Sequence, residues 1–137
     1  MKRSPRSAAD SESGAAVVDF VLVSLVLVPL VLGIVQVALV LHVRNTLTAA
    51  ATEGARYAAT VDRQPQDGVG RTRTQIAGAV ADRFARDVSA RTVVIGGVPT
   101  VEVRVRASIP PLGLWGPSVE LEVAGHAVRE SVPGAAP

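Results

Sequence analysis

The sequence predicts an α+β protein, in which a long N-terminal transmembrane helix extends out of the membrane and leads into a small domain. Two patterns support this fold class. A run of 22 residues without charge extends from Phe20 to Leu41, and apolar and polar residues alternate in the last third of the chain, as in half-buried strands. The chain has 137 residues and no cysteine. Outside the membrane it can therefore form only one small domain, without disulfides.

Residues 1–14 are a polar leader, which we expect to be unstructured because it has little apolar surface to bury. Residues 15–42 form the predicted transmembrane helix. At about 1.5 Å per residue, the uncharged run covers about 33 Å, which spans a hydrocarbon core of about 30 Å. Lipid offers the backbone no hydrogen bonds, so this segment must be helical.

The charges that flank the span predict its orientation. Lys2, Arg3 and Arg6 precede it, and Arg44 and Arg56 follow it. The positive-inside rule then favours a cytoplasmic N-terminus and an extracytoplasmic C-terminal domain, in a single-pass protein of the plasma membrane. A removable secretory signal with cleavage after Ala51 is an alternative, but the apolar run exceeds the roughly 7–15 residues of such signals.

Four residues interrupt the apolar run, namely Ser24, Pro29, Gly33 and Gln36. Pro29 predicts a local bend, because it removes one backbone donor. Ser24 and Gly33 are small enough for another helix to approach closely, or they are simply tolerated by lipid without a partner.

Residues 43–62 are rich in alanine and lack proline, so the helix should continue toward Thr60. A stripe of mostly small residues at helical spacing suits packing against a neighbouring helix or sheet. It consists of Leu47, Ala51, Gly54, Ala58 and Val61.

Residues 63–131 form the predicted small domain, and 132–137 a flexible tail. We expect a loop at 63–70, an amphipathic helix from Thr72 to Ser89, and strands at 92–95, 98–109 and 119–128. The strands should form an antiparallel three-stranded sheet covered by that helix, with Gly96 and Gly97 as a tight turn. A register with Arg106 opposite Glu120 and Arg104 opposite Glu122 places the charge pairs on one face and the valines on the other.

The start of the span carries a short motif. Gly14 and Ala15 are followed by Asp19 and Phe20, immediately before the apolar helix. This string resembles the processing region of type IV prepilins. The resemblance implies cleavage between Gly14 and Ala15 by a prepilin peptidase. It also implies that Asp19, at the fifth mature position, and Phe20 act in assembly, with Asp19 facing the amino terminus of a neighbouring subunit. Those proteins usually have glutamate at this position.

A second string follows the span. Arg44-Asn45-Thr46-Leu47 precedes Glu53-Gly54-Ala55-Arg56-Tyr57. Together with the first motif, it resembles the TadE-like family of small pilin-like membrane proteins. The resemblance implies a minor pilin or pseudopilin of tight-adherence (Flp, type IV-like) pilus assembly. Its partners would be membrane lipid, other pilin-like subunits and the assembly machinery. Glu53, Arg56 and Tyr57 can share a helix face, where they either recognise a partner or lock the helix onto its own domain.

The sequence shows no pattern of catalytic residues, of metal ligands or of a cofactor site. Charges of both signs alternate after the span, which argues against nucleic-acid binding. We therefore expect a structural protein rather than an enzyme. Two alternatives stay open: a signal-anchored accessory subunit of another envelope complex, and a secreted protein released after Ala51.

Overall fold

The structure, a computed structural model, describes residues 6–79, 81–112 and 116–130, with side chains from residue 14 onward. In chain order its elements are α1 (Arg6–Ala59), α2 (Pro65–Ile76), a 3-10 turn (Asp82–Phe84), β1 (Ala85–Ile95), β2 (Val98–Ile109) and β3 (Val119–Val128). The predicted α+β class is confirmed. Part of the leader is helical, since α1 begins at Arg6. The predicted tail, residues 132–137, lies outside the described residues.

The chain divides into two compact units, residues 1–37 and 38–137. In the first, α1 is the element described, and it runs through Pro29 without ending. The segment that begins at Gly14 is long and apolar enough to cross a membrane, and none of its most apolar window is buried. Most large apolar side chains from Val17 to Val37 are at least 40% exposed, as expected for a helix that lipid surrounds.

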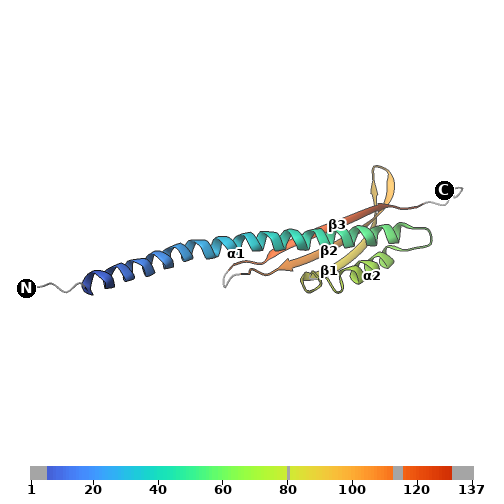
Figure 1. The fold of residues 1–137 in the computed structure, drawn as a ribbon. Helices are drawn as coiled ribbons and strands as arrows, with labels where there is room; N and C mark the ends of the chain where they lie inside the picture. Colours follow the sequence, from blue (N-terminus) through green and yellow to red (C-terminus); the bar gives the residue numbers. More distant parts are fainter. Residues whose placement is uncertain (1–5, 80, 113–115, 131–137) are drawn as a thin grey trace, which may run out of the picture. The chain divides into compact units, whose positions relative to one another are not determined.

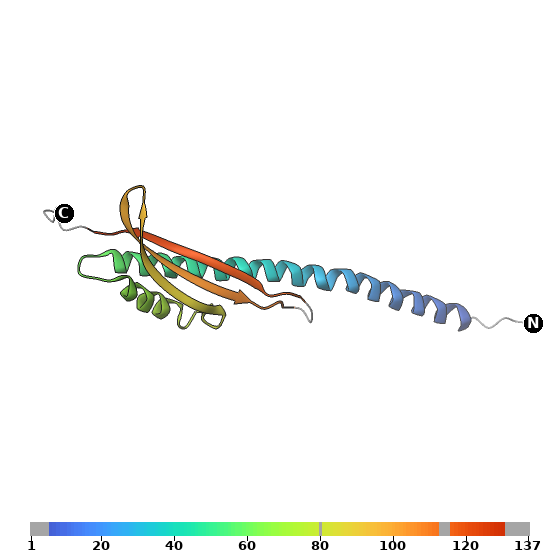
Figure 2. The ribbon, with the colours of Figure 1, turned by 180° about the vertical axis from the view of Figure 1, so that it is seen from behind.

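The second unit is an antiparallel sheet with strand order β1-β2-β3. One face of it is covered by α2 and by the part of α1 that belongs to this unit (Figures 1 and 2). The core between helices and sheet consists of small and β-branched residues. Those that are fully buried are Val43, Leu47, Ala51, Ala55, Ala58, Val101, Val103, Val105, Ala107 and Ile109. The predicted stripe on α1 is thus buried except for Val61, which follows the end of the helix and is 42% exposed.

Helices α1 and α2 pack so closely that their backbones are in contact at two glycines. A Cβ on Gly54 would overlap the Thr72 hydroxyl and lie 2.7 Å from the carbonyl oxygen of Gly68. A Cβ on Gly68 would lie 2.8 Å from the carbonyl oxygen of Gly54 and 2.9 Å from the Cβ of Ala58. The buried hydroxyl of Thr72 donates a hydrogen bond to the Ala50 carbonyl at 3.3 Å. Glycine at these two positions therefore sets the distance between α1 and α2.

The predicted helix from Thr72 to Ser89 is wrong. The helix lies earlier, because Pro65 occupies its first turn and a capping box joins the Gln64 amide to the Asp67 carboxylate at 2.9 Å. It ends at Ile76, two residues before Gly78, whose φ is +85°. Residues 85–89 pair with β2 instead. The four-residue apolar spacing had been read as helical, but strand pairing outweighs it.

The strand pattern at the end of the chain is confirmed, with a different register. Gly96 and Gly97 have φ of +60° and +83°, which suits a two-residue hairpin turn. Arg106 lies opposite Glu122 and Ser108 opposite Glu120, so the predicted register was wrong by two residues. That register would have placed Val123 opposite Val103, in the position of Gly125, where a Cβ would overlap the backbone of α1 at Ala51 and Thr52. A shift of two keeps every side chain on its predicted face.

Two glycines of α2 give a matched test of the helix contact. We expect Gly68→Ala to lower the free energy of unfolding by about 1–3 kcal/mol, because the added methyl group overpacks the contact with α1. Gly70→Ala should raise it by up to about 1 kcal/mol, because alanine is the better helix former and nothing lies within 4 Å of a Cβ there. Chemical unfolding of the full chain in detergent, followed by circular dichroism, measures both. A stabilised Gly68→Ala variant would contradict the contact.

Candidate functional site

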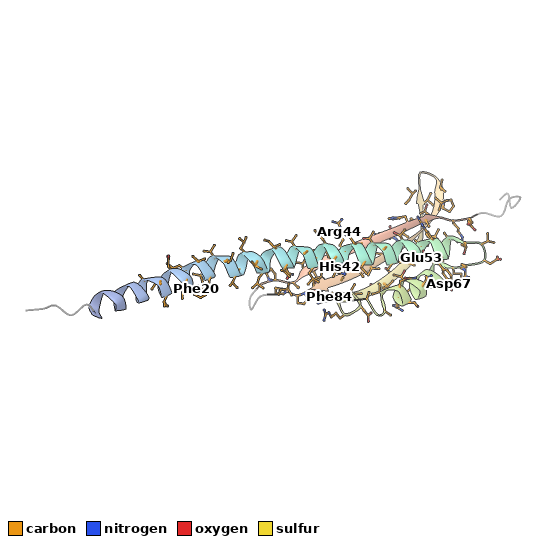
Figure 3. All side chains as sticks on the ribbon, viewed as in Figure 1. Phe20, His42, Arg44, Glu53, Asp67 and Phe84 are labelled. Carbon is orange, nitrogen blue, oxygen red and sulfur yellow. The ribbon has the colours of Figure 1, made fainter. Side chains whose placement is uncertain are left out.

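The residues of the predicted processing and assembly motif lie on the exposed part of α1. Gly14, Ala15, Asp19 and Phe20 are all exposed, and the Phe20 side chain is 73% exposed (Figure 3). No charged residue follows Asp19 until Arg44. A carboxylate at the edge of an apolar span is costly without a partner, so Asp19 is the chemically distinctive group of this segment.

An open hollow lies further along the same helix. Its volume is about 500 Å³, and it is lined by Pro29, Leu30, Gly33, Ile34 and Val37. A Cβ added to Gly33 would have no other atom within 4 Å, apart from its own part of the helix. Eighteen residues of α-helix make about five full turns, so Asp19 and Val37 lie on the same side of α1. The carboxylate and the hollow therefore share one helix face.

Ser24 is not part of this face. Nine residues separate it from Gly33, which corresponds to about two and a half turns. Ser24 and Gly33, the two small residues predicted to allow helix packing, therefore lie on opposite sides of α1. One straight neighbouring helix cannot pack against both.

The second motif lies inside the folded unit and most of it holds α1 against α2. The Glu53 carboxylate pairs with the Arg71 guanidinium at 3.2 Å. Two guanidinium groups lie near the Tyr57 ring, with the guanidinium carbon of Arg63 at 3.8 Å and that of Arg71 at 5.8 Å from the ring centre. Such cation–π contacts each contribute about 0.5–1 kcal/mol at exposed sites.

The other residues of this motif divide between core and surface. Gly54 lies against α2, and Ala55 is fully buried. Arg56 is exposed. Of the two roles considered for Glu53, Arg56 and Tyr57, the contacts of Glu53 and Tyr57 support locking of the helix onto its own domain. Arg56 remains accessible to a partner.

A cluster of charged residues that the sequence analysis did not find crosses the outer face of the sheet. The Glu102 side chain on β2 is only 10% exposed. Its carboxylate accepts hydrogen bonds from Arg91 of β1 at 2.8 Å and from Arg104 at 3.1 Å, and it contacts His126 of β3 at 3.0 Å. All three strands are therefore joined by one carboxylate. The sequence analysis missed this cluster because it requires the pairing of β1 with β2, and part of β1 had been assigned to a helix.

Neighbouring acids continue this pattern. Arg104 and Arg106 both bind the Glu122 carboxylate, at 2.7 Å and 3.1 Å, and the Ser108 hydroxyl donates to Glu120 at 2.6 Å. Burial by itself raises the pKa of Glu102. Hydrogen bonds from His126 and Arg91 and the positive charges of Arg91 and Arg104 outweigh this effect, so the pKa lies below its usual value of 4.5. Within the described ranges, no three His, Asp or Glu side chains converge in a way that could hold a metal ion.

The fold and these sites define an α+β protein with a candidate membrane-spanning helix. Residues 14–56 match the family model described as TadE-like protein, so the resemblance inferred from the sequence is confirmed over this segment. Over this segment the chain is similar to proteins related to the Tad pilus, and together with the apolar helix the match fits a membrane-anchored protein. No curated protein and no solved structure matches the chain significantly.

The Glu102 cluster makes the stability of the sheet sensitive to acid. A carboxylate whose pKa is lowered on folding stabilises the protein above its unfolded pKa, and this contribution is lost as the pH falls through the lowered value. We expect Glu102→Gln to lower the melting temperature at pH 7, by the equivalent of about 1–2 kcal/mol. The difference in melting temperature between this variant and the unmodified chain should become smaller as the pH falls below 4.5.

Melting curves of both chains between pH 7 and pH 3 measure this effect. Glu130→Gln is a suitable control, because Glu130 is exposed and its side chain has no ion pair among the described salt bridges. A constant difference across the pH range would show that the charge of Glu102 does not carry the effect.

Proposed function

We propose that the chain is a minor pilin or pseudopilin that takes part in assembly of a tight-adherence (Flp, type IV-like) pilus at the cytoplasmic membrane. One observation carries this proposal. The segment that matches the TadE-like family is a single helix that begins with the processing motif, continues as an apolar span, and ends in the core of the folded unit. Such a chain has the parts needed to hold a small domain at a membrane and to pack against other subunits.

In this proposal the N-terminus is cytoplasmic, α1 crosses the plasma membrane once, and the sheet unit is extracytoplasmic. The charges before the span support this orientation. A prepilin peptidase cuts between Gly14 and Ala15. The Asp19 carboxylate then forms an ion pair with the new amino terminus of a neighbouring pilin-like subunit. Phe20 and the face with Pro29 and Gly33 contact other helices and lipid. The role is structural rather than enzymatic, and it requires no nucleic acid.

The burial of α1 argues against the secreted alternative. Cleavage after Ala51 would remove Val43, Leu47 and Ala51, each of which is fully buried in the core. It would also remove the carbonyl of Ala50 that receives the Thr72 hydrogen bond. The released chain would lack one side of its own core. The signal-anchored accessory subunit remains the second candidate, and it differs in keeping its leader and in not depending on Asp19.

The first test is the N-terminus of the protein in its native membrane. Mass spectrometry and N-terminal sequencing should find a chain that begins at Ala15. A Gly14→Leu variant should keep its leader, because the residue before the cut changes from glycine to a large side chain. A native chain that still begins at Met1 would favour the accessory subunit over the processed pilin.

The second test concerns Asp19. We expect Asp19→Ala to reduce the amount of surface pili at least tenfold, because the neighbouring amino terminus loses its carboxylate partner, an interaction of at least about 1.4 kcal/mol. Asp19→Glu should retain assembly, since it keeps the charge. Quantification of sheared pili from cells with equal amounts of membrane protein gives the comparison. Normal piliation with Asp19→Ala would exclude the proposed role of this carboxylate.

A further inference from the structure

The end of the sheet where β2 ends and β3 begins lies beside the part of α1 that enters the folded unit (Figures 1 and 2). A Cβ on Gly125 of β3 would overlap the backbone of α1 at Ala51 and Thr52. Further along both elements, the Glu130 amide bonds to the carbonyl of Ala59 at 2.8 Å. Because both residue numbers rise together, α1 and β3 run in the same direction. The start of β3 therefore lies beside an earlier part of α1.

Helix and strand geometry give the level of this end of the sheet. Val119, the first residue of β3, precedes Gly125 by six residues, which cover about 20 Å of strand. The same length corresponds to about thirteen residues of helix, and to fewer where the strand is tilted against the helix. Counted back from Ala51, this places Val119 beside residues 38–43 of α1.

The packing of the core agrees with this level. Leu39 and Val40 are partly buried against the same core as Val119, and Val43 is fully buried in it. Leu41 is 51% exposed and is the last residue of the uncharged run. The last residues of the apolar span and the start of β3 therefore lie at one level of the folded unit.

The loop between β2 and β3, at this level, carries no charge. Thirteen residues separate Arg106 from Glu120, and none of them is charged. The structure describes residues 110–112 and 116–118 of the loop, most of which are exposed, Leu112 by 47%. Three of these six residues are prolines, which have no amide donor to leave unpaired away from water. An exposed loop of this composition can enter the headgroup region of a bilayer at low cost.

Charged residues lie instead at the other end of this part of α1. Asp62 and Arg63 follow α1, and Arg129 and Glu130 follow β3 beside them. The unit is thus charged where α1 ends and uncharged where the span enters it, as expected if only the second end meets a membrane. We propose that the β2–β3 loop lies in the lipid headgroup region beside the last turn of the span, as a second membrane contact of the folded unit.

This second contact would hold the unit in one orientation. The tilt and rotation of a membrane-spanning helix are set by what it packs against and by residues anchored at the interface. The loop lies to one side of α1, so its contact with lipid opposes rotation of the unit about the helix axis. The inference rests on the membrane anchorage of the proposed function, but it does not require a role in the pilus.

Fluorescent labels on single cysteines test this contact, since the natural chain has no cysteine. The full chain is reconstituted in liposomes with lipids that carry nitroxide quenchers at the headgroup and along the acyl chain. Ser118→Cys places the label on the loop, and Val94→Cys places it on an exposed residue at the opposite end of the sheet. We expect the quenchers to lower the fluorescence at Ser118→Cys about twofold and to leave that at Val94→Cys nearly unchanged. Equal quenching at the two positions would overturn the proposal.

A third label separates this inference from the proposed function. Val26 is 69% exposed on the apolar span, so a label at Val26→Cys should be quenched if the chain is anchored as proposed. Quenching at Val26→Cys without quenching at Ser118→Cys would overturn the loop contact and leave the anchorage intact. An absence of quenching at both positions would overturn the anchorage as well.

A charge on the loop should release it from the bilayer. In the Ser118→Cys chain, Leu112→Glu should lower the quenching to the level of Val94→Cys, because liposomes with anionic lipid repel the added carboxylate. Leu112→Met, which keeps an apolar side chain, is the matched control and should retain the quenching. Both variants should keep the melting temperature of the parent, since Leu112 is about half exposed. Undiminished quenching with Leu112→Glu would overturn the proposal.

Discussion

The fold depends on how closely the backbone of α1 approaches the elements around it. Gly54 and Gly68 let the two helices touch, and Gly125 of β3 has no room for a Cβ because the backbone of Ala51 and Thr52 lies against it. Helix α1 is therefore in backbone contact with α2 on one side and with the sheet on another. Three glycines provide this, and a side chain at any of them would push the layers apart.

This close approach also explains why the core can be small. Between α1 and the sheet, alanine and valine dominate, so few large side chains contribute to burial. Short distances between backbones compensate by bringing many atoms into van der Waals contact. The same arrangement makes the second half of α1 part of the folded unit. The apolar span and the α1 residues that enter the core of the domain are consequently parts of one helix.

The two faces of the sheet are stabilised in different ways. The inner face is held by apolar packing under the helices, and the outer face by carboxylates that link neighbouring strands. Glu102 is the central example, because its oxygens contact groups from all three strands.

The sequence by itself determined the features that depend on local patterns. These were the long apolar helix and its end near Thr60, the alternation of β2 and β3, the glycine turn at 96–97 and the resemblance to the TadE-like family. Each follows from residue periodicity, from conformational preference or from a short motif, which neighbouring residues along the chain are enough to define.

Only the tertiary structure decided the features that depend on residues far apart in the sequence. Apolar residues every fourth position between Ile76 and Val88 fitted a helix, yet residues 85–89 became a strand because β2 offered a full row of backbone partners. The register of β3 fits the close approach of α1, because it places Gly125 rather than Val123 against the backbone of Ala51 and Thr52. The Glu102 cluster and the contact at Gly54 likewise require the final arrangement of elements, because their partners are brought together by the fold and not by spacing along the chain.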